Sequence, residues 1–282
     1  MNSLQELDTA IDLWFREDIR EGDHTTISTI PFDAAGTAKL LVKEKGIVAG
    51  VAVAQRIFRR FDADVQFVPL IEDGSVISPG DIAFRVSGRV HSLLQCERLV
   101  LNVMQRMSGI ASKTSEYVRL LEGTGTRILD TRKTTPGMRF LEKEAVRLGG
   151  GGNHRFGLYD MILIKDNHID FAGGIEQAIT ATKAYLEKKK LDLVIVVETR
   201  SLEDIRLVLS IGGVRRILLD NFTVELTREA VKLIDHQLET ESSGGINRET
   251  IRQYAACGVD YISVGALTHQ INSLDLSLKA DY

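Results

Sequence analysis

The feature that most restricts the fold of this chain is the alternation of strand-like and helix-like segments after Gly125. Short apolar runs that end in polar residues or glycine predict six strands: TRILDT, DMILIKD, DLVIVVET, RILLDNF, ETESSGG and DYISVGAL. Helical periodicity between several of these strands predicts helices over residues 174–189, 202–210, 223–238 and 248–257. Strands that recur with a helix every ~20–35 residues pair in parallel through right-handed crossovers.

Six strand–helix units are fewer than the eight of a complete α/β barrel. An incomplete barrel and a doubly wound sheet therefore both fit the pattern. In both architectures the reactive side chains lie at the carboxyl ends of the strands. The residues that follow each predicted strand are thus the first candidates for a functional site.

The first part of the chain has a different pattern, which predicts a separate small sheet domain. Residues 37–89 contain short β-rich runs that are broken by glycine turns. A helical segment over residues 53–61 interrupts these runs, and a long helix over residues 92–111 follows them. That long helix is apolar on more than one side, so we expect it to be buried. Residues 270–282 are expected to return to this domain.

The amino-terminal segment, residues 1–18, predicts an amphipathic helix with one apolar stripe: Leu4, Leu7, Ile11 and Phe15. The segment carries acidic residues and has no continuous apolar core, so it is not typical of a signal peptide. No apolar run in the chain approaches the ~18 residues that a membrane span requires. We therefore expect a soluble, cytoplasmic protein with no membrane partner.

Charge and cysteine content argue against two classes of protein, namely nucleic-acid-binding and disulfide-stabilised proteins. The formal net charge of −4 argues against sequence-independent binding of nucleic acid, which requires a basic surface. The chain has two cysteines, Cys96 and Cys257, and their wide separation in a chain of this kind favours a reduced pair over a disulfide. We expect neither a nucleic-acid partner nor a disulfide framework.

Polar side chains gather at the predicted strand ends. The cationic residues among them are Arg132, Lys133 and Lys165, and the loop before DMILIKD adds His154 and Arg155. Two carboxylates follow separate strands, Glu198 and Asp220. Cations crowded into one cleft repel one another, so the simplest ligand is an anion with several charges. Arginine forks suit carboxylate or phosphate groups, and lysines supply point charges.

Each of these residues also has a structural interpretation. A solvated loop would explain Arg132 and Lys133, and a hydrogen-bonded loop position would explain His154. Glu198 and Asp220 are equally suited to be N-caps of the helices that follow them. The joint placement of these side chains at successive strand ends nevertheless favours a ligand site.

Glycine turns follow the last two predicted strands. Ser243, Gly244 and Gly245 form one of them, and Gly265 forms the other, with His269 four residues further on. Glycines let backbone N–H groups approach an anion, so both turns fit a phosphate site, although left-handed turns use the same residues. The four glycines at 149–152 suit either a hinge or a backbone nest. The sequence has no zinc-type spacing and no nucleotide-binding glycine motif of the Walker or dinucleotide kind.

At these residues the sequence resembles a known family. The stretch LDTRKTTPGMRFLEKEAVRLGGGGNHRFGLYDMILIKDNHI closely resembles the signature region of the quinolinate phosphoribosyltransferases. Shorter segments are similar to the same family, in the expected order: EDIREGDHTT, ERLVLNVMQRMSGIAS, VVETRSLED, LLDNF, SSGGI and VGALTH. The resemblance covers essentially the whole chain. Its long stretch is highly specific, whereas the short segments would be weak alone.

The resemblance implies a two-domain α/β fold. An N-terminal α/β sandwich domain, residues 1–108 completed by residues 270–282, would precede an incomplete parallel α/β barrel of six to seven strands, residues 109–269. The resemblance also implies a homodimer whose active sites are shared between subunits, and it leaves open whether dimers assemble into hexamers.

The reaction that the resemblance implies is transfer of a phosphoribosyl group from phosphoribosyl pyrophosphate to quinolinate with loss of CO2. The products would be nicotinate mononucleotide, pyrophosphate and CO2, in de novo NAD biosynthesis, and the cofactor would be Mg²⁺. Nicotinate lacks one carboxylate of quinolinate, so part of a cationic pocket would face no partner. We therefore expect nicotinate to be a poor substrate.

The family's site residues carry over one by one. Quinolinate would be held by Arg132, Lys133, Thr134, His154, Arg155 and Lys165, with Arg98 from the neighbouring subunit. Glu198 and Asp220 would bind the ribose hydroxyls of phosphoribosyl pyrophosphate and, directly or through water, Mg²⁺. The 5′-phosphate would be bound at Ser243, Gly244, Gly245, Gly265, Ala266 and Leu267, with His269 nearby. The catalytic residues would be Lys133, Lys165, Glu198 and Asp220.

Arg98 is also unusual by its position. It lies between Leu94 and Leu101 on one helix face, which is an odd place for a merely solvated arginine. The alternative is an arginine whose stem covers apolar surface while its head reaches water.

Three other functions stay open at this point. One is a related phosphoribosyltransferase with the same fold and a different substrate. Another is a Schiff-base aldolase that uses Lys165, for which a lysine of lowered pKa is required. The third is a non-catalytic binding module, because EDGSVISPGD resembles a turn of lipoyl-type carrier domains.

Overall fold

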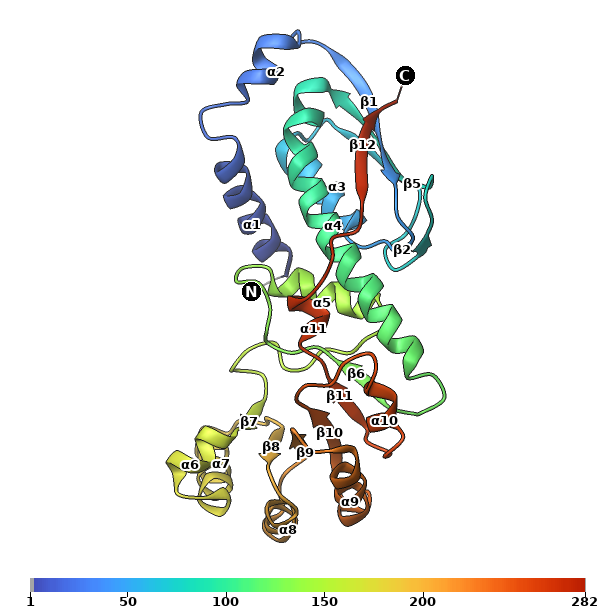
Figure 1. Cartoon of the computed structure of the whole chain (residues 1–282). Helices are drawn as coiled ribbons and strands as arrows, with labels where there is room; N and C mark the ends of the chain where they lie inside the picture. Colours follow the sequence, from blue (N-terminus) through green and yellow to red (C-terminus); the bar gives the residue numbers. More distant parts are fainter. Residues whose placement is uncertain (1–2, 282) are drawn as a thin grey trace. The chain divides into compact units, whose positions relative to one another are not determined.

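The computed structural model describes residues 3–281, which fall into two compact units (Figure 1). The first unit comprises Met1–Ser115, Thr135–Gly150 and Gln270–Tyr282, and the second comprises Glu116–Thr134 and Gly151–His269. This division assigns residues 109–115 and 135–150 to the first unit, whereas the sequence prediction assigns them to the barrel. Residues 1 and 2 of the predicted first helix lie outside the described residues.

The first unit is built on an antiparallel sheet with the strand order β12-β1-β5-β3. Its strands are β1 (Ala35–Val42), β3 (Gln66–Pro69), β5 (Ile82–Arg89) and β12 (Leu276–Ala280), and a separate pair is formed by β2 (Gly46–Ile47) and β4 (Val76–Ile77). Its helices are α1 (Ser3–Asp18), α2 (His24–Thr29), α3 (Val51–Phe61), α4 (Val90–Leu120, of which residues 116–120 belong to the second unit) and α5 (Arg139–Leu148).

Aromatic packing and ion pairs hold this unit together. Three phenylalanines, Phe58, Phe67 and Phe84, contact one another between α3 and the sheet, with the closest ring centroids 4.4 Å apart. Helix α1 is joined to α3 by two bidentate ion pairs: Arg56 with Asp8, and Arg60 with Asp12. Both arginines are on α3 and four residues apart, so they reach the same face of α1.

The C-terminal segment runs along α4 and then joins the sheet as β12. Leu274 N donates to Gln105 O at 3.0 Å, and β12 pairs antiparallel with β1 in the register Leu40↔Leu278. The approach to α4 is close at Gly109, where a Cβ would lie 2.2 Å from Asn272 O. A glycine in mid-helix normally destabilises the helix, and here it makes room for the chain segment that leads to β12.

The second unit contains a parallel six-stranded sheet, as the alternation predicts. Its strands are β6 (Arg127–Leu129), β7 (Ile162–Ile164), β8 (Ile195–Thr199), β9 (Arg216–Asp220), β10 (Glu239–Ser243) and β11 (Tyr261–Ser263). Its helices are α6 (Asp166–Ala172), α7 (Ile175–Lys189), α8 (Leu202–Ile211), α9 (Val224–Ile234), α10 (Ile251–Ala255) and α11 (Ala266–His269).

The strand order distinguishes the two architectures that the sequence leaves open. The order is β6-β11-β10-β9-β8-β7, which is the sequential order of a barrel that is interrupted between β6 and β7. A doubly wound sheet would reverse its order at an internal switch point. The second unit is therefore an incomplete α/β barrel.

The opening of the barrel is crossed by an irregular segment, residues 152–161. Gly152 forms a parallel bridge with Leu129 of β6, and Arg155 Nη1 donates to Met161 O, next to β7, at 3.4 Å. This segment thus runs from one edge strand to the other, where a complete barrel has further strand–helix units.

Several predicted element limits are wrong. Helix α4 extends to Leu120 instead of residue 111, and the helix predicted over 223–238 ends at Ile234 because Asp235 and His236 have positive φ angles of 45° and 58°. The helix predicted over 248–257 shortens to α10. Four short helices were not predicted: α2, α5, α6 and α11.

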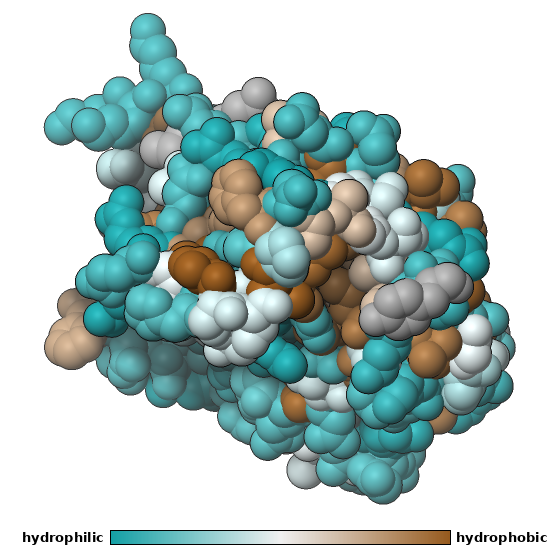
Figure 2. Space-filling model, turned by 90° about the horizontal axis from the view of Figure 1, so that it is seen from above, coloured by the Kyte–Doolittle hydropathy of each residue, from teal (hydrophilic) through white to brown (hydrophobic). Residues whose placement is uncertain are grey.

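Among the described residues, no helix is both long enough and apolar enough to cross a bilayer. Cys96 and Cys257 are free and buried. Figure 2 shows one face of the molecule, on which hydrophobic residues reach the surface among predominantly hydrophilic ones. Leu94 on α4 is one of the exposed hydrophobic residues, with 41% of its surface accessible.

Candidate active site

Strand register identifies which side chains share one face of the barrel. Glu198 of β8 is opposite Leu218 of β9, and Asp220, two residues after Leu218, is opposite Ser243 of β10. Residues two apart in a strand point to the same face, so Glu198, Asp220 and Ser243 share a face at the carboxyl end of the sheet. Below them the same face carries a buried apolar cluster of Leu163, Val196 and Leu218, with the partly buried Met161 packed against it.

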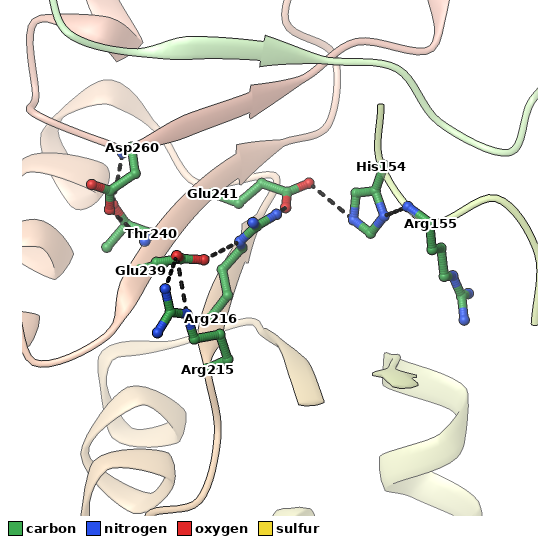
Figure 3. Close-up of polar contacts among 8 residues, drawn as sticks. All are labelled: His154, Arg155, Arg215, Arg216, Glu239, Thr240, Glu241 and Asp260. Atoms are coloured by element: carbon green, nitrogen blue, oxygen red, sulfur yellow. Dashed lines mark hydrogen bonds and ion pairs between the residues drawn. The ribbon is translucent and has the colours of Figure 1, made fainter. Parts of the chain in front are cut away.

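Another part of this face is charged (Figure 3). Glu241 of β10 is fully buried, and its Oε2 accepts a hydrogen bond from Arg216 Nη1 at 2.8 Å. Arg216 Nε donates to Glu239 at 3.1 Å, and the guanidinium lies 3.9 Å from the centre of the Tyr261 ring. Burial raises the pKa of Glu241, but His154 and Arg216 outweigh it, so the pKa lies below its ordinary value. Glu241 is therefore an ionised carboxylate inside the barrel.

Asp130, which directly follows β6, holds the segment that crosses the barrel opening. Its side chain is buried, and Oδ2 accepts from Asn153 Nδ2 at 2.6 Å while Oδ1 accepts from His154 N at 2.8 Å. His154 Nδ1 accepts from Arg155 N at 2.7 Å, and His154 Nε2 lies 3.5 Å from Glu241 Oε1. The structure thus anchors the predicted residues His154 and Arg155 to β6 on one side and to β10 on the other.

Asp130, Arg216 and Glu241 were not predicted as site residues from the sequence. A signal for Glu241 was present, because an acid in the middle of a buried barrel strand must have a buried partner. Glu241 is such an acid, at the third position of the predicted strand ETESSGG. The identity of the partner was not readable, since Arg216 lies on another strand.

The cationic side of the site is centred on Arg155. This side chain is buried, and no carboxylate of the described residues lies within ion-pair distance of it. Burial lowers the pKa of Arg155, and the nearby positive charge of Arg132 lowers it further. A buried guanidinium beside a second arginine is costly unless an anion is bound, so this position is suited to a carboxylate or phosphate ligand.

The carboxylate side of the site consists of Glu198 and Asp220. Glu198 is 6% exposed, and its Oε2 lies 3.9 Å from Lys165 Nζ while its Oε1 accepts from Asp166 N at 3.4 Å. Burial raises the pKa of Glu198, and the negative charge of Asp220 raises it further, against the opposing effect of Lys165. The two carboxylates are therefore close enough to repel each other, and a cation between them would relieve this repulsion.

The N-cap interpretation of these two carboxylates is wrong. Helix α8 is capped by Ser201, whose side chain accepts from Asp204 N, and α9 is capped by Thr223, whose side chain accepts from Leu226 N. Glu198 and Asp220 lie before these caps and take no part in them. A structural explanation that the sequence leaves open is thereby removed.

The turns after β9 and β10 interlock. Asn221 has a positive φ of 54°, its N donates to Ser243 O at 2.9 Å, and its Nδ2 donates to Asp220 Oδ2 at 2.7 Å. Gly244, with φ of 94°, faces this side chain: a Cβ there would lie 2.2 Å from Asn221 Oδ1. The space next to Gly245 is open. The missing side chain of Gly244 therefore leaves room for the amide that orients Asp220.

The turn after β11 lies against the turn after β6. Thr268 Oγ1 donates to Lys133 O at 2.8 Å, and a Cβ on Gly265 would lie 3.0 Å from both Lys133 Cδ and His269 Nε2. Of the other predicted residues here, Leu267 is fully buried, Ala266 is half-buried, and Thr134 N donates to Arg132 O at 2.9 Å. Since the Leu267 side chain lies in the core, only its backbone is available to a ligand.

Two of the sequence features lie wholly or partly outside this unit. Arg98 is exposed on α4, in the first unit. Gly149 also belongs to the first unit, where a Cβ would lie 2.4 Å from Ala111 O, so this glycine is required for packing against α4. Gly152 belongs to the second unit and forms the bridge to β6.

The carboxylates of this site could bind a metal ion only together with ligands from the substrate or water. Within the described chain, no group of three or more histidine, cysteine or acidic side chains could hold an ion by itself. Mg²⁺, however, is commonly held by one or two carboxylates together with substrate phosphates and water. Glu198 and Asp220 supply two oxygen ligand groups whose mutual repulsion a divalent cation would offset, so they fit that arrangement.

Comparison with known proteins gives a consistent result over the whole chain. The family model described as "Quinolinate phosphoribosyl transferase, N-terminal domain" matches residues 23–108, and the corresponding C-terminal domain model matches residues 110–279. A chloroplastic nicotinate-nucleotide pyrophosphorylase (carboxylating) of Arabidopsis thaliana is 43% identical, with 98% of this chain and 83% of that protein covered.

Bacterial relatives are similar over almost their full length. A Bacillus subtilis protein named "Probable nicotinate-nucleotide pyrophosphorylase (carboxylating)" is 42% identical, with 99% of this chain and 94% of that protein covered. The crystal structure of NadC from Streptococcus pyogenes superposes with a TM-score of 0.93 at 39% identity, covering 100% of this chain and 99% of that one.

The raised pKa of Glu198 makes this carboxylate a cost to the folded state at neutral pH. A carboxyl with a raised folded-state pKa favours folding fully below its ordinary pKa, and this contribution is lost as the pH rises through the raised value. The Glu198→Gln variant should therefore be more stable than the parent at pH 7, with a Tm higher by roughly 2–4 °C, equivalent to about 1 kcal/mol. Thermal unfolding between pH 4 and pH 8 measures this, and the difference should disappear at the acidic end. A variant that melts below the parent at pH 7 would contradict the assigned electrostatics.

The interlocked turns predict unequal effects at adjacent glycines. Gly245→Ala should cost about 1–2 kcal/mol, because its positive φ is disfavoured but the space is open. Gly244→Ala should cost ~3 kcal/mol or more, because the methyl group also meets Asn221. Urea unfolding measures both, and adding Asn221→Gly to Gly244→Ala should recover part of the loss. Equal losses at the two positions would show that the turns do not interlock in solution.

Proposed function

This chain belongs to the quinolinate phosphoribosyltransferase family, and we propose that it forms nicotinate mononucleotide from quinolinate and phosphoribosyl pyrophosphate with release of pyrophosphate and CO2. The observation that carries the proposal is the division of charge along one edge of the barrel. Arg155 and Arg132 lie on the side that suits an anion, while Glu198 and Asp220 lie on adjacent strands on the side that suits a cation. Joining an anionic ring to a sugar that becomes positive needs this combination.

Quinolinate recognition is assigned to the cationic side. The two ring carboxylates would be bound by the side chains that follow β6 and β7 and by the segment that crosses the opening: Arg132, Lys133, Thr134, Arg155 and Lys165. Because Arg155 is buried, a carboxylate bound to it would exchange water for a charge-assisted, bidentate partner. This binding would orient the ring nitrogen toward the sugar.

The ribose is assigned to the carboxylate side. As pyrophosphate departs, the anomeric carbon gains positive charge, and Glu198 and Asp220 would stabilise that charge and bind the ribose hydroxyls. Asn221 would hold Asp220 in place through its bond to Oδ2. The backbone of Ser243, Gly244, Gly245, Gly265, Ala266 and Leu267, with His269 nearby, would receive the 5′-phosphate.

Mg²⁺ belongs to the same proposal. Glu198 and Asp220 would hold it together with oxygens of phosphoribosyl pyrophosphate, and it would neutralise charge that develops on the pyrophosphate group. Lys133 and Lys165, both exposed at the edge, are the protein's own cations for that charge.

Decarboxylation follows from the bond that is formed. Once the ring nitrogen is alkylated, the cationic ring stabilises the electron pair that CO2 leaves behind on carbon 2. That carbon then takes up a proton from solvent, which completes the nicotinate ring. No covalent nucleophile on the protein is needed. The environment of Lys165 also disfavours the aldolase alternative: its side chain is half exposed and its Nζ lies 3.9 Å from Glu198, whereas a Schiff-base lysine requires a desolvated setting.

Assembly into a homodimer completes the proposal. Arg98 is exposed on α4 beside the exposed Leu94, which suits a residue that a second subunit presents to the site. Further assembly into hexamers is open. The expected location is the cytoplasm, although the Arabidopsis thaliana relative is named as chloroplastic.

A direct assay tests the reaction. Protein, phosphoribosyl pyrophosphate, Mg²⁺ and quinolinate should give equal amounts of nicotinate mononucleotide and CO2, followed together by chromatography and labelled carboxylate. Nicotinate should show at least ~100-fold lower kcat/KM, because losing one carboxylate leaves a buried cation without its partner. Chelation of Mg²⁺ should abolish turnover, and adding it back should restore turnover. Equal use of nicotinate would sink the dicarboxylate assignment, and no product from folded protein would point to another anionic heterocycle.

Mixed dimers test whether active sites are shared. Arg98→Ala and Lys165→Ala should each be inactive alone, since each removes one charge from every site. In a randomly mixed population half of the dimers are heterodimers with one intact site, so about a quarter of the parent activity should return. Co-expression with two affinity tags gives the mixture, and refolding each variant alone is the control. If no activity returns on mixing, Arg98 acts within its own subunit or not at all.

A further inference from the structure

Both ring nitrogens of His154 face protein groups. Arg155 N donates to Nδ1 at 2.7 Å, so Nδ1 carries the lone pair and the neutral ring carries its proton on Nε2. Nε2 lies 3.5 Å from Glu241 Oε1, which is within ion-pair distance but longer than a normal hydrogen bond. That oxygen is buried and has no hydrogen bond in the part of the chain that the structure describes, so the ring N–H is the polar group it faces. His154 itself is only 9% exposed.

The partner of His154 is held firmly. Glu241 Oε2 is bonded to Arg216, which is bonded in turn to Glu239 and stacked on Tyr261, so the carboxylate is fixed by two neighbouring strands (Figure 3). Interaction with His154 and Arg216 keeps Glu241 ionised in spite of its burial. An ionised carboxylate only accepts hydrogen bonds, so it selects the ring tautomer with the proton on Nε2.

The resemblance places His154 among the groups that hold quinolinate, but this geometry points to another role. We propose that His154 is a positioning residue that contacts no substrate atom: Glu241, held by Arg216, fixes the Nε2–H tautomer, and Nδ1 holds the backbone of Arg155. The proposal rests on the proposed function in one respect, namely that Arg155 binds a substrate carboxylate.

The arrangement explains how a buried arginine is aimed from an irregular segment. The segment 152–161 has no ladder of strand bonds beyond the bridge at Gly152. Asp130 holds the amide of His154, and His154 holds the amide of Arg155, so two successive backbone groups are fixed from within the barrel. The guanidinium of Arg155 therefore projects from a fixed backbone. The imidazole of His154 serves to hold that backbone in place.

Two isosteric variants separate the functions of the two ring nitrogens. In His154→Asn, the side-chain oxygen takes the place of Nδ1 and still accepts from Arg155 N. In His154→Gln, the side-chain amide takes the place of Nε2 and still presents an N–H to Glu241, but Arg155 N loses its acceptor. We expect the KM for quinolinate to stay within about threefold in His154→Asn and to rise roughly tenfold or more in His154→Gln, with kcat little changed in both; removal of a group that orients a ligand typically costs this much. The reverse order would show that Nε2 is the functional atom and would overturn the proposal.

Nitrogen NMR of the parent protein gives a second measurement that does not depend on a variant. In protein labelled with 15N-histidine, the signals of His154, assigned by their loss in His154→Asn, should report a bare Nδ1 and a protonated Nε2. Saturating quinolinate should leave this tautomer and the hydrogen bond to Nδ1 unchanged. A protonated Nδ1, or a new hydrogen bond from the ring to quinolinate, would refute the proposal. If the parent protein does not turn over quinolinate, the proposed function fails, and the tautomer measured without ligand still decides whether His154 is held as described.

Discussion

Parallel pairing of six strands in sequential order is the constraint on which the rest of this structure depends. It directs every carboxyl end to one edge, so residues as far apart in the sequence as Lys133 and Thr268, which are separated by 135 positions, meet there. Glu198, Asp220 and Ser243 share a face because of strand register alone. The interruption of the barrel between β6 and β7 then leaves an opening that an irregular segment can cross. The most buried cation of the site, Arg155, comes from that segment.

Both the cationic and the carboxylate side of the site contain a buried charge that is electrostatically unfavourable in the folded protein. Arg155 is buried beside Arg132, and Glu198 is buried beside Asp220, and in each case the shift in pKa shows that the folded protein disfavours the charge. Groups of this kind are stabilised when a ligand of opposite charge binds. The site therefore prefers ligands whose charges match these groups. The same argument explains why one missing carboxylate on the substrate matters, since a buried cation would keep its cost.

The interior of the barrel contains both apolar and charged side chains. The charged side chains can orient a neighbouring polar group, which apolar side chains cannot do. Leu163, Val196 and Leu218 fill one region by packing alone. The ion pair of Arg216 with Glu241 instead orients the imidazole ring of His154. A carboxylate fixes the tautomer of the ring it faces, whereas a methyl group does not. Buried ion pairs are weak evidence for stability, so a role in orientation is the more economical explanation for this one.

The sequence by itself determined the fold class and the candidates at the strand ends, because periodicity and strand-end residues are local properties of the chain. It identified Arg132, Lys165, Glu198 and Asp220 from their place after apolar runs and Arg155 from the loop before one, and the family resemblance joined them to a reaction. Helix limits were less readable: α9 stops at Ile234 because two residues adopt positive φ angles, and α4 continues past residue 111 with Thr114 and Tyr117 buried at helical spacing. Only the tertiary structure decided between a barrel and a doubly wound sheet, and only it revealed Asp130, Arg216, Glu241 and Asn221 as the groups that hold the site residues. The physical reason is that strand order and buried hydrogen-bond partners depend on contacts between distant segments, and such contacts leave no periodic trace in the sequence.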